Sequence, residues 1–398
     1  MSAPAATAAA AAAPARLYVD ALNFGGQFVS RDHWKLSEIT DNVGLFVGAA
    51  KRSSIELKVF IDETIRTGDA LQKWQRRRER EVRTGRRNVP HGMSELVGDA
   101  FRQAGVDVHY SEELDNDDTL ASFAQADGAA ILSADRDFFD YRDSTFDVYD
   151  DFNVTASRAL ELRPARAKGP QRNCKALVLD RYPQTKTTPQ RVHAGTTVYR
   201  RGAPSGLVRL AGNPHITVRP LRQALYHDVG IRSPVIEVFP YWDDAADCVK
   251  WTDEAVPPDG SLSHLLTTPK DAVKHFFGRD LRPAGVSWLD WNNHLFSVHA
   301  IVAELCVERM RPTSLLDIMN EFVRSRLVAD DVSDRLASLA SLAISSQPVY
   351  KFTCAACQAF QRLKQSEVDW FTSRRLELPK TCKSCRSKNG RRRHKGRT

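Results

Sequence analysis

Long hydrophobic runs are absent from this sequence of 398 residues. No apolar stretch approaches the roughly 20 residues that a helix needs to cross a bilayer, so we expect no membrane association. The alanine-rich segment 1–15 contains no basic residue and is too weakly hydrophobic for a signal peptide. It also lacks the Arg and Ser content of a transit peptide. We interpret it as a disordered leader.

Cysteine is scarce, with seven in the chain, and three of these, Cys174, Cys248 and Cys306, are isolated in the sequence. Such a distribution argues against a disulfide framework and is typical of a reducing compartment. We therefore expect an intracellular protein, nuclear or cytoplasmic.

Positive charge is present in excess, with a net charge of +8 and a pI of about 9.1, which favours polyanionic partners. The excess is concentrated in the segments 73–87 and 388–398. Either segment alone is equally well explained as a solvated helix face or a tail, and the tail also resembles a nuclear-import signal. Two clusters beside the acidic pattern described below favour nucleic acid, DNA or RNA, as the partner.

The remaining four cysteines form two C-x-x-C pairs near the C-terminus, separated by 24 residues, slightly more than the usual zinc spacing of about 15–20. Each pair can present two thiolates from one tight turn, and two pairs complete a tetrahedral zinc site with no open position. We therefore predict a structural zinc module at 350–387; four unligated thiols are the alternative. The predicted ligands are Cys354, Cys357, Cys382 and Cys385.

The segment around these pairs resembles a family of small zinc-binding domains. Two knuckles in that family bracket a Glu-x-x-aromatic-aromatic element and a proline before the second pair. The matching residues here are Glu367, Trp370, Phe371 and Pro379. The resemblance covers only this part of the chain.

Carboxylates follow apolar runs repeatedly in the first third of the chain. The runs 17–20, 57–63 and 129–137 read as buried strands, and 114–121 reads as a helix with an acidic first turn. Continuous apolar strands separated by helices predict a parallel sheet that is covered on both faces. The carboxyl ends of such strands share one edge, where ligands bind. We therefore expect Asp20, Asp62 and the pair Asp135 and Asp137 to converge.

Converging carboxylates need a counter-charge, because two at about 4 Å repel by about 4 kcal/mol even at a dielectric near 20. Hard divalent cations with all-oxygen ligands remove that repulsion, and Mg²⁺ or Mn²⁺ suits the set. Two ions about 3.5–4 Å apart can support hydrolysis of a phosphodiester. Each acidic residue alone has a plainer interpretation, as a helix cap, a turn residue or a partner of the helix dipole.

The same runs together resemble the PIN-like fold of the flap-endonuclease (XPG-like) family, and within it the Asteroid group. The resemblance rests on Val19-Asp20-Ala21, on Val59-Phe60-Ile61-Asp62 with its following basic helix, and on LDNDDTLASFA and ILSADRDFF. It implies a site of two metal ions held by Asp20, Asp62, Asp115, Asp117, Asp135 and Asp137. It further implies that the basic helix contacts the substrate backbone and scissile phosphate through Lys73, Arg76, Arg77, Arg78 and Arg80.

This sequence departs from the family pattern in four respects. The glycine after the second aspartate is replaced by Glu63, and the first of the paired acids is the shorter Asp115. No helix-two-turn-helix segment is recognisable after the last acids, and the extra aspartate of the family has only Asp150 and Asp151 as candidates. The resemblance therefore does not imply a preference for flaps.

The expected organisation is an α/β chain of several parts. A PIN-like domain with a parallel sheet flanked by helices spans 16–160, followed by a loop-rich linker at 161–205. A mainly α-helical accessory domain of unknown role spans 206–345, and it contains no glycine-rich phosphate loop. The small zinc-ribbon-like module at 350–387 and a basic tail at 388–398 complete the chain. The sequence leaves the oligomeric state open.

Three functions fit these features. The first is a Mg²⁺- or Mn²⁺-dependent nuclease, which we favour because the acidic set is largely retained. The second is a catalytically inactive PIN-like protein of the Asteroid type that binds nucleic acid or acts as an adaptor. The third is a phosphatase on small phosphoesters, which the long basic helix disfavours because it suits a polymer.

Overall fold

A computed structural model of the chain describes residues 13–29, 36–62, 68–84, 91–111, 116–165, 175, 177, 197–199, 213–243, 245–277, 288–310, 314–325, 350–353, 360–363 and 380. The chain divides into two compact units, residues 1–332 and 333–398. We describe each unit by itself.

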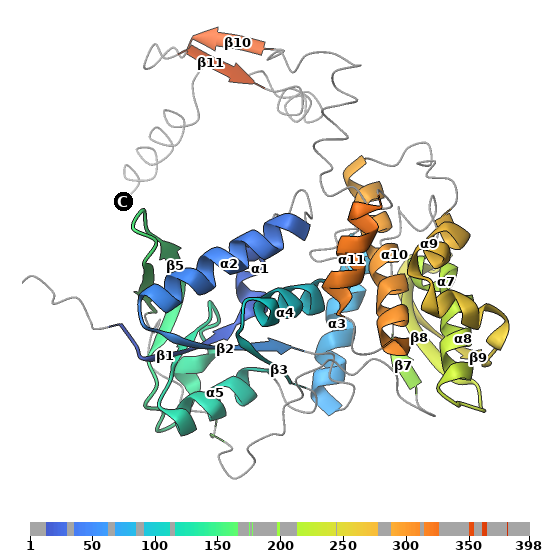
Figure 1. The fold of residues 1–398 in the computed structure, drawn as a ribbon, viewed down its shortest axis with the longest axis horizontal. Coiled ribbons are helices and arrows are strands. Elements are labelled where there is room, and N and C mark those ends of the chain that lie inside the picture. The colour runs from blue at the N-terminus through green and yellow to red at the C-terminus, as the bar shows by residue number, and fades with distance from the viewer. Residues whose placement is uncertain are drawn as a thin grey trace, which may run out of the picture. The chain divides into compact units, whose positions relative to one another are not determined.

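The first unit is built on a six-stranded sheet with the order β3-β2-β1-β4-β5-β6 (Figure 1). The first five strands are parallel, and β6 joins β5 in antiparallel fashion. The parallel α/β architecture predicted from the sequence is thus confirmed. In chain order the strands are β1 (Arg16–Asp20), β2 (Glu56–Asp62), β3 (Asp107–Ser111), β4 (Ala130–Leu132), β5 (Val148–Val154) and β6 (Leu160–Pro164).

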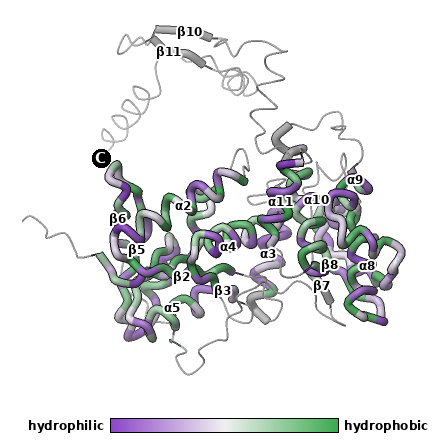
Figure 2. The backbone as a smooth tube through the Cα atoms, viewed as in Figure 1, coloured by the Kyte–Doolittle hydropathy of each residue, from purple (hydrophilic) through white to green (hydrophobic). Residues whose placement is uncertain are grey.

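Both faces of this sheet are buried, because successive side chains of each strand point to opposite sides. Leu17 and Val19 of β1 join the core beneath α2 (Leu36–Arg52) and α4 (Met93–Gln103). Tyr18 between them joins a second core with α5 (Asn116–Asp127) on the other face. Figure 1 shows α2 and α4 on one side of the sheet and α5 on the other. Two-sided burial explains why the strands read as continuous apolar runs (Figure 2).

Shorter helices and one basic helix connect these elements. They are η1 (Ala21–Phe24) and α1 (Gly25–Phe28) after β1, α3 (Gly68–Thr84) after β2, and η2 (Asp137–Asp140) after β4.

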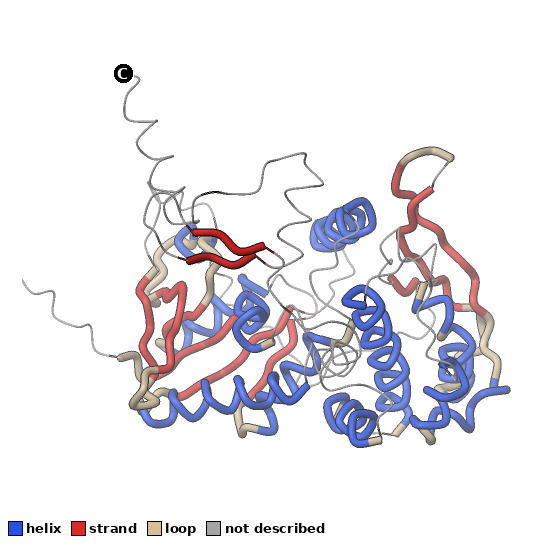
Figure 3. Tube along the Cα trace, turned by 90° about the horizontal axis from the view of Figure 1, so that it is seen from above, coloured by secondary structure: helices blue, strands red, loops and turns tan. Residues whose placement is uncertain are grey.

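The described residues in the later part of the first unit form several helices and also a small sheet. The helices are α7 (Pro214–Thr217), α8 (Arg219–Asp228), η3 (Gly260–Thr267), α9 (Pro269–Phe277), α10 (Trp288–Arg309) and α11 (Leu315–Arg324). The strands β7 (Thr197–Tyr199), β8 (Val235–Asp243) and β9 (Cys248–Val256) pair in the order β7-β8-β9. The long hairpin β8–β9 lies on the right-hand side of Figure 3. The sequence had indicated a mainly helical region, so the strands are an addition to that expectation.

The sheet and the later helices share one hydrophobic core, which runs from Leu17 of β1 to Phe322 of α11. The backbone N–H of Leu316 donates to the buried Asp99 carboxylate of α4 at 3.1 Å. Gly92 precedes α4 with φ +77°, and a Cβ there would lie 3.1 Å from Ala300 Cβ. Glycine therefore suits this position both for its backbone angle and for the close approach of α10.

The second unit has one described pair of strands, β10 (Tyr350–Thr353) and β11 (Phe360–Leu363), which are antiparallel. The predicted zinc ligands lie outside the described residues, and so do most of the leader and the tail. Among the described helices of both units, none is long and apolar enough to cross a membrane.

Candidate metal centre

The acidic residues lie at the carboxyl edge of the sheet, where the strand order changes direction. From β1 the chain adds β2 and β3 on one side and then returns to place β4 on the other. Ligands of open α/β sheets bind beside such a reversal, outside the carboxyl ends of the strands. Asp20 is the last residue of β1 and Asp62 is the last residue of β2.

Three carboxylates come together here in a geometry that can hold a cation. One side-chain oxygen from each of Asp117, Asp135 and Asp137 lies within 4.8 Å of the other two. Asp117 is buried in the first turn of α5, whereas Asp135 and Asp137 are exposed in the segment after β4. The first turn of a helix suits an acidic residue because the backbone N–H groups there point at it.

The segment after β4 is folded by its own side chains. The backbone N–H of Asp135 donates to Ser133 Oγ at 3.1 Å, and that of Asp137 donates to Asp135 Oδ1 at 3.1 Å. In each of these two turns a side chain accepts a hydrogen bond from the backbone N–H two residues later. Ser and Asp side chains commonly form such turns. They place the two aspartates next to each other.

Asp20 is buried beside this group and is held by two neutral donors. Ser133 Oγ donates to Asp20 Oδ2 at 3.1 Å, and Asn23 Nδ2 donates to the same oxygen and to Ser133 Oγ, the latter at 2.7 Å. The pKa of Asp20 is raised from 3.8 to about 8, and burial of the carboxyl is the largest cause. The charges of Asp117, Asp62 and Asp135 contribute to this rise, while the hydrogen bond from Ser133 opposes it. A buried carboxylate beside three others is a place that a cation would stabilise.

Two cations of the chain lie against the edge of this acidic group. Arg77 Nη1 of α3 is 3.8 Å from Asp62 Oδ2, and both side chains are about half exposed. Lys175 Nζ is 3.6 Å from Asp137 Oδ2. Lys175 reaches this place because its backbone pairs with that of Tyr141.

The basic helix α3 presents most of its charge to solvent. Lys73, Arg76, Arg77 and Arg80 are exposed, and their spacing of three and four residues places them on one side of the helix. Arg78 is different: it is 9% exposed, lies over the Trp74 ring and pairs with Glu81 at 2.9 Å. Its placement does not favour the phosphate contact predicted for it.

The structure brings some of the predicted acidic residues together and places others elsewhere. Asp20, Asp62, Asp117 and Asp135 interact electrostatically, and Asp137 joins the last two. Asp115 lies outside the described residues. Asp150 and Asp151, the candidates for an extra aspartate, both pair with Arg163 on β6.

Three residues of the site were not singled out from the sequence. Asn23 and Ser133 carry a signal that was available: one lies three residues after a strand-end aspartate, and the other opens the alternation Ser-x-Asp-x-Asp. Lys175 carries none, because only the fold brings it to Asp137.

The donor set fits a hard divalent cation. All the groups that converge are carboxylate oxygens, and no described histidine or cysteine joins them. Such a set suits Mg²⁺ or Mn²⁺ better than a softer metal. The geometry of Asp117, Asp135 and Asp137 is thus compatible with a site for a divalent cation.

No model of a known protein family matches the chain, and no curated protein matches it.

Proposed function

We propose that the chain is a metal-dependent nuclease that hydrolyses phosphodiester bonds in DNA or RNA. The observation that carries the proposal is the cluster of Asp117, Asp135 and Asp137 oxygens within 4.8 Å of one another, with Asp20 beside it at the carboxyl edge of the sheet. The order and spacing of these acids, on a parallel sheet, also support the PIN-like, XPG-like assignment of the Asteroid type. That assignment stands here as part of the proposal.

The metal would be Mg²⁺ or Mn²⁺, held by Asp117, Asp135 and Asp137, with Asp20 and Asp62 closing the site and Asp115 as a further ligand. When bound, such ions lower the pKa of water and stabilise negative charge on a phosphate. Asn23 and Ser133 orient Asp20, and ligand-orienting hydrogen bonds of this kind support metal affinity. A structural zinc in the 350–387 module belongs to the same proposal.

The basic face of α3 supplies the contact with a polyanion. Lys73, Arg76, Arg77 and Arg80 offer several positive charges in a row, as a phosphate backbone requires. Arg77 links this row to the metal centre, since it lies 3.8 Å from Asp62. A phosphate chain lying along α3 would therefore pass close to the carboxylates.

Two ion pairs at the metal centre favour one alternative to a nuclease. Arg77 beside Asp62 and Lys175 beside Asp137 partly neutralise the carboxylates without any metal. A protein of this fold that binds nucleic acid or a protein partner but does not cleave would be expected to keep such pairs. That alternative predicts salt-dependent binding without turnover.

Cleavage of labelled single-stranded, flapped and duplex DNA and RNA tests the proposal. The full chain would be assayed with Mg²⁺, with Mn²⁺ and with EDTA, together with the double variant Asp135→Asn/Asp137→Asn. The matched control is Asp147→Asn, an exposed carboxylate just before β5 and thus at the opposite edge of the sheet. A chromogenic phosphomonoester serves as the small substrate.

We expect metal-dependent cutting that the double variant loses by on the order of 100-fold or more, because loss of two ligands should cost at least as much as the roughly 10–100-fold of a supporting residue. Asp147→Asn should retain the activity. Cutting that persists in the double variant would refute the assigned site. Binding of oligonucleotides without cutting would favour the inactive binding protein, and turnover of the monoester alone would favour the phosphatase.

A further inference from the structure

The basic helix α3 has too few apolar residues to be held by an ordinary hydrophobic face. Lysine and arginine account for six of its 17 residues, and of the side chains described only Arg78 and Val82 are buried. Figure 2 colours α3 as a largely hydrophilic element. A helix of this composition needs specific polar and aromatic contacts to fix its orientation.

Those contacts come from a distant part of the chain. In sequence α3 lies between β2 and α4, yet among the described elements its most extensive packing is against β8 and β9. Trp251 Nε1 of β9 donates to Glu79 Oε1 of α3 at 2.8 Å. The Trp251 ring also lies against Trp74, with the ring centroids 6.0 Å apart.

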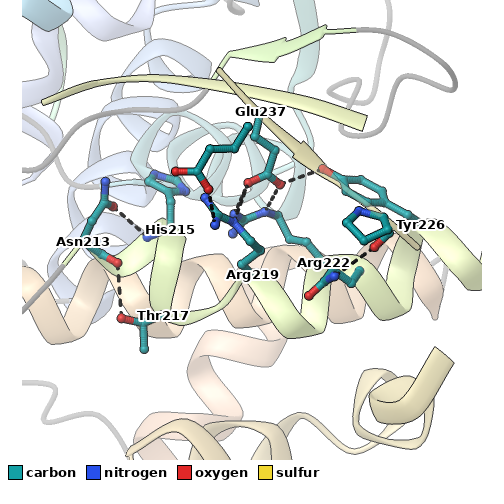
Figure 4. A network of polar contacts seen from close by, with 10 residues as sticks. Asn213, His215, Thr217, Arg219, Arg222, Tyr226 and Glu237 are labelled. Carbon is teal, nitrogen blue, oxygen red and sulfur yellow. Dashed lines mark hydrogen bonds and ion pairs between the residues drawn. The ribbon is translucent and has the colours of Figure 1, made fainter. Parts of the chain in front are cut away.

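The opposite face of the β8–β9 hairpin is fixed to α8 by a buried ion pair (Figure 4). Arg222 donates to the two carboxylate oxygens of Glu237 at 2.6 Å each, and both side chains are fully buried. Tyr226 Oη donates to Glu237 Oε1 at 3.0 Å. A bidentate pair with a further donor leaves little freedom for the strand that carries it.

The register of the hairpin shows that these two contacts lie on opposite faces. Glu237 pairs with Glu254, whereas Trp251 pairs with Pro240, three positions along β8 from Glu237. Residues an odd number apart on a strand point to opposite sides. The hairpin is therefore held by α8 on one face and supports α3 on the other.

The orientation of α3 decides where its charges lie. Trp74 and Glu79 face the hairpin, and the exposed Lys73, Arg76 and Arg80 follow the helix from a different side. A rotation of α3 would move these cations relative to the carboxylates, and Arg77 would leave Asp62.

We infer that the β8–β9 hairpin is a positioning element for the helix that binds the phosphate backbone, with Trp251 as its positioning residue. This inference rests on the proposed function. It gives the hairpin Val235–Val256, within the predicted accessory region, a role: it sets the orientation of the basic helix beside the metal centre.

Hydrogen exchange of the full chain, measured by mass spectrometry, tests the structural half. The variants are Trp251→Ala, which removes the ring, and Trp251→Phe, which keeps a ring but loses the donor. Glu79→Gln keeps an acceptor for Trp251 and is expected to behave like the wild type. The matched control is Trp291→Phe, a buried tryptophan of α10 that stacks on His294.

We expect amides of 68–84 to exchange roughly tenfold faster or more in Trp251→Ala, and a smaller increase in Trp251→Phe, as the loss of a hydrogen bond and a ring contact predicts. Exchange in α5 and β1 should stay at the wild-type level in both. Unchanged exchange of 68–84 in Trp251→Ala would overturn the inference, and so would an equal increase throughout the first unit.

Binding and cleavage of a labelled single-stranded oligonucleotide test the functional half. Trp251→Ala should raise KM about tenfold with kcat within about twofold, and should make the logarithm of affinity fall less steeply with the logarithm of salt concentration. Faster exchange of α3 in Trp251→Ala with an unchanged KM and salt slope would overturn this inference and would leave the proposed function intact. Failure of the wild type to bind any oligonucleotide would instead refute the proposed function and the substrate-positioning role with it, and hydrogen exchange would still show whether the hairpin holds α3.

Discussion

The environment of Asp20 differs strongly from that of an ordinary surface carboxyl, because the side chain is buried beside other carboxylates. Its pKa of about 8 in the folded chain, against 3.8 unfolded, means that the folded state binds this proton more tightly. The stabilisation from this group is therefore fully present below pH 3.8, is lost as pH rises toward about 8, and changes no further above that. A cation bound at the site would offset the loss of stability that ionisation of Asp20 causes at high pH.

We predict that Asp20→Asn removes this pH dependence. In EDTA, the free energy of unfolding of the wild type should fall by on the order of 5 kcal/mol between pH 4 and pH 8 relative to the variant. Thermal unfolding followed by circular dichroism across that range measures the difference. Asp147→Asn, at the opposite edge of the sheet, serves as control and should keep the wild-type slope. Parallel curves for Asp20→Asn and the wild type would contradict the prediction.

Ser133 acts on the metal centre without being one of its carboxylates. It donates to Asp20 and accepts from the Asp135 backbone, so Ser133→Ala should loosen both. We predict that Mn²⁺ affinity, measured by calorimetric titration, falls roughly 10–100-fold. The equally buried Ser297 of α10 supplies the control, since Ser297→Ala should leave the affinity unchanged. Equal affinities in the two variants would show that Ser133 does not orient the site.

Among single residues, the sequence predicted the carboxylates of the site better than the residues that surround them. Asp20 and Asp62 could be placed because a strand-end position in a parallel sheet fixes the edge on which a side chain lies. The burial of Arg78 could not be predicted, because a run of arginines does not show which of them will pack against a tryptophan and a glutamate. Lys175 depends on a backbone pairing with Tyr141 that no local pattern indicates.

At the scale of elements, α4 lies close to the sheet because of one glycine. A Cβ on Gly98 would lie 2.2 Å from Tyr110 Oη and 2.9 Å from Ile61 Cδ1. Tyr110 cannot move freely, since Arg102 Nη2 donates to its hydroxyl at 2.9 Å. The space between α4 and the strands β2 and β3 is therefore filled.

We predict that Gly98→Ala lowers the free energy of unfolding by about 1–3 kcal/mol, because overpacking outweighs the better helix propensity of alanine. Gly44→Ala in α2 has nothing within 4 Å of the new Cβ and should instead raise stability by about 0.5–1 kcal/mol. Urea unfolding of the two variants measures both signs. A stabilising Gly98→Ala would show that α4 can move away from the sheet at little cost.

The β8–β9 hairpin shows why one element escaped prediction. A glutamate at an inward position and Pro240 within the strand both weaken the alternation that identifies a strand. Glu237 is tolerated inside because Arg222 and Tyr226 of α8 satisfy it. The strand pattern of β8 can be recognised only when it is known that α8 supplies partners for Glu237. The central strands need no such partner, since their apolar runs reflect burial on both faces.

At the scale of the whole molecule, the second unit carries a prediction about metal content. The first cysteine pair lies in the segment 354–359, which connects the antiparallel strands β10 and β11. Two cysteines separated by two residues can present both thiolates to one tetrahedral zinc ion. We predict one zinc per chain by mass spectrometry of the purified protein, lost in Cys382→Ser/Cys385→Ser and kept in Cys248→Ser, an exposed cysteine of β9. Equal zinc in the two variants would exclude the assigned ligands.

The first unit should unfold as one body, because residues from β1 to α11 contribute to a single core. Asp99 of α4 is 2% exposed, and burial raises the pKa of its carboxyl, whereas the backbone N–H groups of Leu316 and Leu315 in α11 lower it. Asp99→Ala removes the acceptor of these N–H groups in the first turn of α11. We predict a loss of about 1–2 kcal/mol.

Hydrogen exchange along a thermal ramp measures how that loss is distributed. The segments 93–111 and 288–325 should lose protection at the same temperature in the wild type, and at the same lower temperature in Asp99→Ala. Gln103→Ala removes an exposed contact to Asp317 across the same pair of helices and should change stability by less than about 0.5 kcal/mol. If 288–325 lost protection first while 93–111 stayed protected, the later helices would be a separate domain, and the orientation of α3 would rest on a body that moves independently of the metal centre.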